Sequence, residues 1–268
     1  MISKTTLFAF VVSMTSMAGL ACSGSEPVDT GTNEGAARIE TESGLAINFV
    51  SVRDSKRATH ADPGAGLETC DTDIEYVQLT GTRFDEKINA ILKSEAGVPT
   101  EPCDDPRMID SRATIRFMGK GFMSVMESGG SYYAGAAHPN SEFIYKNVDV
   151  TTGERVTLDK LLLPAAKDTI LRSIRAQIAI QKDGSGRTAV PLDDSLKSAL
   201  RDALGYTVPQ DRALSDIQSF SLSSAGVRID LSNALPHALQ ALDAEYLVRW
   251  RTLADVMQPA AKQRFGVR

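Results

Sequence analysis

The chain has 268 residues, of which 42% are hydrophobic and 24% are charged, and this balance is ordinary for a globular protein. Its 29 lysines and arginines are outnumbered by 34 acidic residues, so the formal net charge is -5. Nucleic-acid binding and electrostatic membrane binding both need clustered basic residues, and no polybasic run is present. The composition therefore argues against nucleic acid as a partner.

The first 21 residues have the pattern of an export signal. Lys4 precedes an apolar run over residues 7–20, which has the length of a signal core and is too short to span a membrane. The run ends in Gly19-Leu20-Ala21-Cys22, and lipoprotein signal peptidase cleaves between a small residue and a cysteine, although Gly19 stands where leucine is usual. We predict a lipoprotein signal peptide at 1–21 and a palmitate-type lipid on Cys22. The alternative is an ordinary secretory signal with an incidental cysteine.

The segment after the signal has the composition of a linker. Residues 22–44 are rich in glycine, serine, threonine and acidic side chains, which cannot bury a core, so we predict a flexible tether. Regular hydrophobic patterns begin at Leu45 and continue toward the C-terminus. We predict a small N-terminal subdomain at 45–128, merged with a larger C-terminal domain at 129–268.

The hydrophobic periodicity predicts both strands and helices. Period-two alternation and β-branched content predict strands over 46–52, 74–79, 112–118, 122–127, 142–150, 220–222, 227–231 and 246–250. Helical spacing of apolar residues predicts helices over 83–94, 157–163, 165–181, 194–204 and 252–257. Strands and helices come in clusters rather than in strict alternation. This order predicts an α+β fold, with an antiparallel sheet and packed helices.

Two cysteines remain once Cys22 is assigned to the lipid. Cys70 and Cys103 are an even pair in an exported chain, so we predict a disulfide between them. Closing such a loop stabilises a fold by about 3–4 kcal/mol in the chain-entropy model. The alternative is two free thiols. No C-x-x-C spacing is present, which argues against a redox or zinc role.

The sequence contains none of the local motifs that identify common enzymes. It has no G-x-S-x-G elbow, no H-E-x-x-H pair and no phosphate-binding glycine loop. The three histidines, His60, His138 and His237, are too far apart to form a metal-binding pair on one helix. The acidic pair Asp193-Asp194 is typical of a helix start. We therefore predict no catalytic residue, no metal site and no cofactor.

One stretch has the composition of a contact surface. Residues 129–140 (GGSYYAGAAHPN) combine paired tyrosines, small residues and a histidine before proline. Tyrosines give a large contact area at low entropy cost, so Tyr132, Tyr133, Gly135 and His138 are the candidate ligand-binding residues of a predicted surface loop. The alternative interpretation is a tight crossover between strands, in which His138 bonds to the backbone.

A resemblance to a known family rests on this stretch and its surroundings. Residues 133–138 (YAGAAH), the strand at 142–150 and residues 152–162 (TGERVTLDKLL) resemble the signature of the RsiV-like domain family, with Ala136 in place of the second glycine of its Gly-Gly-Ala-His pattern. Residues 75–81 (EYVQLTG), with Ile88-Asn89, resemble the small partner domain that also begins PdaC-type deacetylases. The segments 220–231 and 250–257 are similar to the family's closing hairpin and last helix.

The resemblance covers roughly residues 70–260 and implies a binding role. The RsiV domain is the outward-facing part of an anti-sigma factor and binds lysozyme. PdaC catalysis belongs to a separate deacetylase domain with an H-x-x-x-H metal motif, which this chain lacks. The resemblance therefore implies the binding module without either effector.

These observations lead to a prediction of function with two alternatives. We predict an envelope lipoprotein, held to a membrane by its N-terminal lipid and more consistent with an outer than an inner membrane. Its non-catalytic module binds an extracytoplasmic protein, lysozyme-like, or a peptidoglycan-type glycan. The alternatives are a cell-wall hydrolase or deacetylase with an unrecognised site, and a structural or assembly lipoprotein without a soluble ligand.

Overall fold

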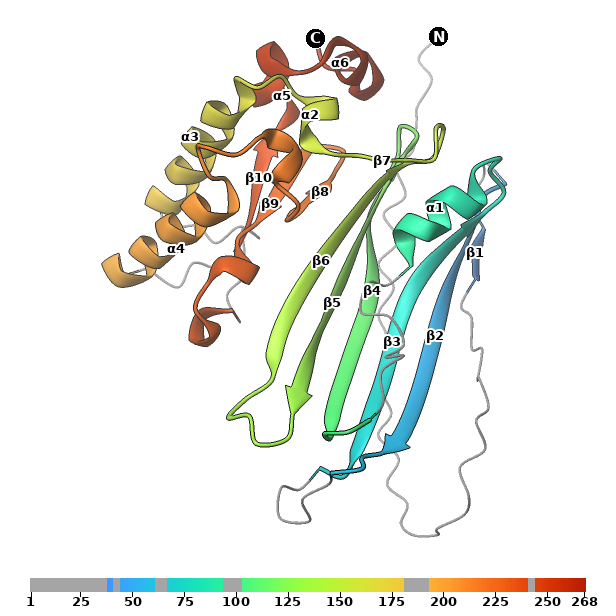
Figure 1. The fold of residues 1–268 in the computed structure, drawn as a ribbon. Coiled ribbons are helices and arrows are strands. Elements are labelled where there is room, and N and C mark those ends of the chain that lie inside the picture. Colours follow the sequence, from blue (N-terminus) through green and yellow to red (C-terminus); the bar gives the residue numbers. More distant parts are fainter. Residues whose placement is uncertain (1–37, 41–43, 61–66, 94–102, 181–192, 241–243) are drawn as a thin grey trace. The chain divides into compact units, whose positions relative to one another are not determined.

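The computed structural model describes residues 38–40, 44–60, 67–93, 103–180, 193–240 and 244–268 (Figure 1). All of them belong to one compact unit, residues 32–268. The lipidation candidate Cys22 and the predicted signal at 1–21 lie outside the described residues. Among the helices of the described ranges, none is both long enough and apolar enough to cross a membrane.

A seven-stranded sheet carries the first half of the fold, and its strands lie in the order of the sequence. Its strands are β1 (Arg38–Glu40), β2 (Ala46–Arg57), β3 (Thr69–Thr80), β4 (Arg107–Gly119), β5 (Phe122–Tyr133), β6 (Asn140–Asp149) and β7 (Glu154–Arg155). Neighbouring described strands are antiparallel except β3 and β4, which are parallel. Parallel neighbours need a crossover connection, and the connection between these two contains helix α1 (Asp85–Leu92).

Helix α1 packs on one face of this sheet. Its Ile88 and Leu92 are fully buried against apolar side chains of β2, β3, β4, β5 and β6, which are Ile47, Val77, Leu79, Ala113, Met123, Val125 and Val148. Asn89 fixes the helix to the sheet, because its side chain bonds to the backbone N–H (2.8 Å) and carbonyl (2.9 Å) of Leu79. We refer below to this side of the sheet as the α1 face.

The predicted disulfide is confirmed and joins the start of β3 to the segment before β4. Cys70 and Cys103 are bonded, their Cα atoms are 5.8 Å apart, and their sequence separation is 33. Both are buried in a small cluster with Ala58. The bond therefore ties the start of β3 to the end of the connection that leads into its parallel neighbour β4.

The second half of the chain packs on the opposite face of the large sheet. It contains a three-stranded antiparallel sheet, in the order β10 (Glu245–Arg249), β9 (Gly226–Asp230), β8 (Phe220–Leu222). Around it lie helices α2 (Leu158–Leu161), α3 (Ala166–Ala179), α4 (Asp194–Thr207), α5 (Trp250–Leu253) and α6 (Pro259–Phe265), and short 3₁₀ turns at 214–216, 232–234, 237–239 and 254–256. In α3, Ile170, Ile174 and Ile178 are fully buried, which is the four-residue spacing that predicted this helix.

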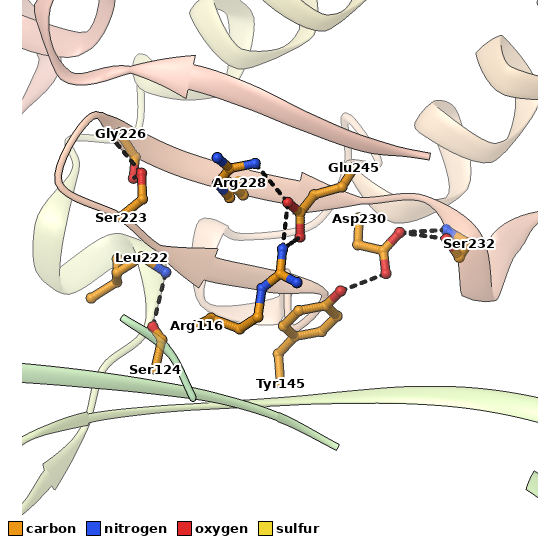
Figure 2. A network of polar contacts seen from close by, with 10 residues as sticks. All are labelled: Arg116, Ser124, Tyr145, Leu222, Ser223, Gly226, Arg228, Asp230, Ser232 and Glu245. Atoms are coloured by element: carbon orange, nitrogen blue, oxygen red, sulfur yellow. Dashed lines mark hydrogen bonds and ion pairs between the residues drawn. The ribbon is translucent and has the colours of Figure 1, made fainter. Parts of the chain in front are cut away.

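A polar network lies between the two sheets (Figure 2). The Glu245 carboxylate on β10 accepts hydrogen bonds from Arg116 on β4 (2.5 and 2.7 Å) and from Arg228 on β9 (2.8 Å). Tyr145 on β6 donates to Asp230 at the end of β9 (2.6 Å). Burial, with the nearby Asp230 carboxylate, raises the pKa of Tyr145 above its ordinary range, so its hydroxyl stays protonated and able to donate.

A β-bulge in β4 positions Arg116 in this network. The register of β4 with β5 shifts between Ile115 and Phe117, so Arg116 is the extra residue. Before the bulge, Ile115 packs on the α1 face, whereas Phe117 packs against the core of the second half. The bulge therefore turns β4 at the point where it meets the three-stranded sheet.

The prediction of an α+β fold is confirmed. The parallel β3–β4 pair differs from the all-antiparallel sheet that we predicted, because the helix between the strands returns the chain to the same end. Strand β1 lies within the segment 22–44 predicted as a tether, and β5 runs across the predicted subdomain boundary at 128–129. Strand β7 and helix α6 were not predicted.

We expect Glu245→Ala to lower the free energy of unfolding by about 1–3 kcal/mol, because it leaves two arginines without their carboxylate partner at a part-buried interface. Glu154→Gln is the control, since the Glu154–Lys87 pair is half exposed on both sides and such solvent-screened pairs contribute little to stability. Urea unfolding of both variants measures the difference. Equal effects would show that the Glu245 network does not hold the sheets together.

Candidate ligand-binding groove

The stretch 129–140 is half strand and half turn, which agrees with the alternative of a tight crossover between strands rather than with a long surface loop. Gly129 to Tyr133 complete β5, Asn140 begins β6, and the connecting turn is residues 134–139. The glycines are needed for close strand packing: a Cβ at Gly129 would lie 2.0 Å from the Asp110 carbonyl oxygen, and one at Gly130 would lie 2.3 Å from that of Asn140. The small residues of this stretch thus let three backbones approach one another closely.

The four candidate residues do not converge on one point. Tyr133 is 46% exposed, and Tyr132 is half-buried on the other face of the strand, because successive strand residues point to opposite sides. Gly135 has a φ of +82°, so its place in the turn suits glycine. His138 is exposed in the turn, and its Nδ1 lies 3.3 Å from the Pro139 carbonyl oxygen. This contact agrees with the alternative of a backbone-bonded histidine.

Tyr133 borders a groove of about 510 Å³ at the ends of β4, β5 and β6. The described residues that line it are Ile109, Asp110, Ser111, Glu127, Gly129, Gly130, Ser131, Tyr133, Asn140, Ser141, Glu142, Ile144 and Asn233. Strand alternation places the side chains of Ser111, Glu127, Ser131, Tyr133 and Glu142 on the α1 face, and those of Asp110 and Ser141 on the other. The groove therefore continues the α1 face beyond the region that α1 covers.

The other wall is closed by a residue that follows β9. Asn233 uses its side chain to bond both backbone groups of Phe143, accepting from the N–H (2.9 Å) and donating to the carbonyl oxygen (2.6 Å). It thus pairs with the outer edge of β6 in the way that a neighbouring strand would. The groove wall is consequently fixed by both halves of the chain.

A buried ion pair lies at the inner side of the groove. Glu127 on β5 and Lys146 on β6 are 1% and 0% exposed at their side chains, and Lys146 Nζ lies 2.7 Å from Glu127 Oε1. Lys146 also donates to the carbonyl oxygens of Leu92 (3.1 Å) and Lys93 (2.8 Å), at the C-terminal end of α1. An ammonium group has three N–H donors, and these three contacts use them.

The second carboxylate oxygen of Glu127 is left without a hydrogen bond. Oε2 is buried and has no partner among the described residues. An unmade hydrogen bond at a buried group costs about 1–3 kcal/mol, and more when the group is charged. Buried acceptors of this kind are exceptional in native proteins. Glu127 thus brings an unused acceptor to a groove that it also lines.

The lining of the groove consists mainly of hydrogen-bonding groups. Its described side chains supply serine hydroxyls, one tyrosine, two amides and carboxylates, and they include no histidine, cysteine, lysine or arginine. In the part of the chain that the structure describes, no cluster of three or more metal-ligating side chains occurs. The groove can therefore accept hydrogen bonds and present the ring of Tyr133.

Glu127, Lys146 and Glu142 were missed by the sequence analysis. Glu127 and Lys146 stand inside strands among apolar residues (FMSVME and FIYKNV), where a charge at an inward position is unusual. Two such charges of opposite sign in neighbouring strands are the signal that could have indicated a buried pair. In contrast, Val156, Leu158, Leu161 and Leu162 of the resemblance segment 152–162 lie in the core of the second half, away from the groove.

Comparison with solved structures identifies proteins with a similar fold. A member of the DUF3298 family from Bacteroides fragilis NCTC 9343 superposes with a TM-score of 0.52 at 11% identity, covering 81% of this chain and 97% of its own. A DUF3298 family protein from Pseudomonas aeruginosa PAO1 has a TM-score of 0.50 at 13% identity, covering 80% and 95%. This chain shares their fold. No protein-family model matches the sequence, and no curated protein is detectably similar to it.

The close packing of β4 and β5 at Gly129, which lines the groove, can be tested by two glycine substitutions. We expect Gly129→Ala to lower the free energy of unfolding by about 1–3 kcal/mol, because the added methyl overlaps backbone atoms of β4. Gly205→Ala is the control: it lies in helix α4 with no atom near the added methyl, and it should raise stability by about 0.5–1 kcal/mol. Urea unfolding distinguishes them. A neutral Gly129→Ala would contradict the close packing of β4 and β5.

Proposed function

We propose that this protein is a cell-envelope lipoprotein whose domain binds an extracytoplasmic protein or a peptidoglycan-type glycan in the groove beside Tyr133, without breaking a bond. The observation that carries the proposal is the groove of about 510 Å³, which combines an exposed aromatic ring with an unused buried acceptor. Ligand sites are typically concave and orient a ligand through a few polar groups. The export-signal pattern at 1–21 and the resemblance to RsiV-like domains support a role outside the cytoplasm.

The proposal favours binding over catalysis because of the groups that the groove offers. Its described lining contains serine hydroxyls but no histidine or lysine that could act as a base beside them. The buried polar cluster between the sheets is saturated: Glu245 accepts from two arginines, and Asp230 accepts from Tyr145 and Ser232. Groups held in this way stabilise an interface and are not available to a substrate.

A binding measurement with matched tyrosine variants tests the proposal. The full chain carrying Cys22→Ala is purified and titrated with hen lysozyme and with tetra-N-acetylglucosamine. We expect at least one to bind, and Tyr133→Ala to weaken that binding by about 1–2 kcal/mol, as loss of an aromatic anchor does. Tyr206→Ala is the control, because Tyr206 is 77% exposed on α4 and does not line the groove.

Three results would contradict the binding proposal. Neither compound binds, or Tyr133→Ala and Tyr206→Ala behave alike, or the purified protein releases products from peptidoglycan. The last result would favour a cell-wall hydrolase or deacetylase instead.

The lipid anchor is tested separately. Because the apolar run ends at Ala21-Cys22, cells that express the gene should incorporate radiolabelled palmitate into this protein. Cys22→Ala should take up no label and should move from the membrane to the soluble fraction. Membrane fractionation that persists in Cys22→Ala would exclude Cys22 as the anchor.

A further inference from the structure

We infer that the groove accommodates a cationic nitrogen group, the guanidinium or ammonium of a basic side chain on a protein partner, held by the carboxylates of Glu127 and Glu142. The inference deepens the proposed function and rests on it, since it selects a basic protein segment over a neutral glycan. The chemical class of the ligand follows from the carboxylates that line the groove and from the lack of a cationic side chain among its described lining residues.

Glu127 supplies the first argument. One of its carboxylate oxygens is engaged by Lys146, whose three donors are used at Glu127, Leu92 and Lys93. The other oxygen, Oε2, accepts no hydrogen bond from the described residues, although the side chain is 1% exposed. A carboxylate accepts and cannot donate, so what completes it must be a donor. Glu127 therefore keeps one acceptor oxygen that the described residues do not use, and the same residue lines the groove.

The charge of the lining supplies the second argument. Glu142 pairs with Gly129 in the strand register, so its exposed side chain projects from the same face as Glu127. No described lining residue is cationic, so Glu142 has no opposite charge within the groove lining. A neutral sugar can donate hydroxyl hydrogen bonds to these carboxylates, but it leaves their negative charge without a counter-charge, which is costly for a buried group. A guanidinium group offers five N–H donors in a planar fork and neutralises charge.

The remaining lining residues suit the same ligand. The hydroxyl oxygens of Ser111 and Ser131 and the side-chain amide of Asn140 can accept further hydrogen bonds from a cationic group. The exposed ring of Tyr133 can stack on a guanidinium plane. A net charge of -5 also favours approach of a basic partner. Because the groove opens to the surface beside Tyr133, a side chain can enter while its main chain stays outside.

The test uses a peptide pair that differs only in charge. The full chain with Cys22→Ala is titrated with fluorescent hexa-arginine and with hexa-citrulline, a neutral peptide of nearly the same shape. We expect hexa-arginine to bind and hexa-citrulline to bind at least about tenfold more weakly, with salt weakening the former. Equal binding of the two peptides would overturn the inference, as would no binding of hexa-arginine.

Charge-matched variants locate the site. Glu142→Gln and Glu127→Gln should each weaken hexa-arginine binding by at least about tenfold, whereas Asp202→Asn should change it by less than about twofold. Asp202 is exposed on α4, outside the groove, so this control removes the same charge. Glu142→Gln leaves the Glu127–Lys146 pair intact, so it tests the site even if Glu127→Gln unfolds. An equal loss in Glu142→Gln and Asp202→Asn would mean attraction by net charge alone and would overturn the inference.

The outcomes separate this inference from the proposed function. If lysozyme or the glycan binds through Tyr133 while hexa-arginine does not bind, the cation site is wrong and the binding module stands. If hexa-arginine binds through Glu142 while neither lysozyme nor the glycan binds, the cation site stands and the proposed partners are wrong.

Discussion

The carboxylate of Glu245 lies at the junction of the two halves of this protein and pairs with arginines of both sheets, beside the Tyr145–Asp230 and Asn233–Phe143 hydrogen bonds. Here Glu245 on β10 lies between Arg116 from the large sheet and Arg228 from its own sheet. A single carboxylate that pairs with arginines from both sheets fixes the position of one sheet on the other. The bulge at Arg116 shifts the alternation of β4, so that Phe117 faces the core of the second half while Ile115 and Met118 face the α1 side.

The second buried ion pair has a different character. Glu127 and Lys146 lie within one sheet, on the face that α1 partly covers, and the last carbonyl groups of α1 hold the ammonium. The Glu245 cluster is saturated with donors, whereas Glu127 keeps one oxygen unused among the described residues. Buried polar groups tend to be fully satisfied, so an incomplete pair beside an open groove is more informative about ligands than a complete one. This contrast separates the structural cluster from the candidate site.

The similarity to the DUF3298 structures concerns the backbone fold that carries the groove. At 11% and 13% identity the shared feature is the arrangement of strands and helices. The residues that carried the family resemblance divide between two roles in this chain. Those near Tyr133 form the end of β5 and the turn beside the groove, whereas Val156 and Leu158 are core residues. A fold can keep its core pattern while the side chains at the strand ends change, so the ligand chemistry must be argued from this groove itself.

The sequence by itself determined the elements whose signals are local. Isoleucines at four-residue spacing specified α3, alternation and a Gly-Lys-Gly turn specified the β4–β5 hairpin, and the cysteine count specified the Cys70–Cys103 bond. The tertiary structure alone decided the roles of Gly129, Arg116 and Glu127. Gly129 belongs to a stretch whose composition suggested a loop, yet it lies in β5. Glycine is required there because the neighbouring backbone leaves no room for a Cβ. Arg116 and Glu127 find partners 129 and 19 residues away, and no periodicity within one strand encodes which distant charge will face it or which oxygen will remain unpaired.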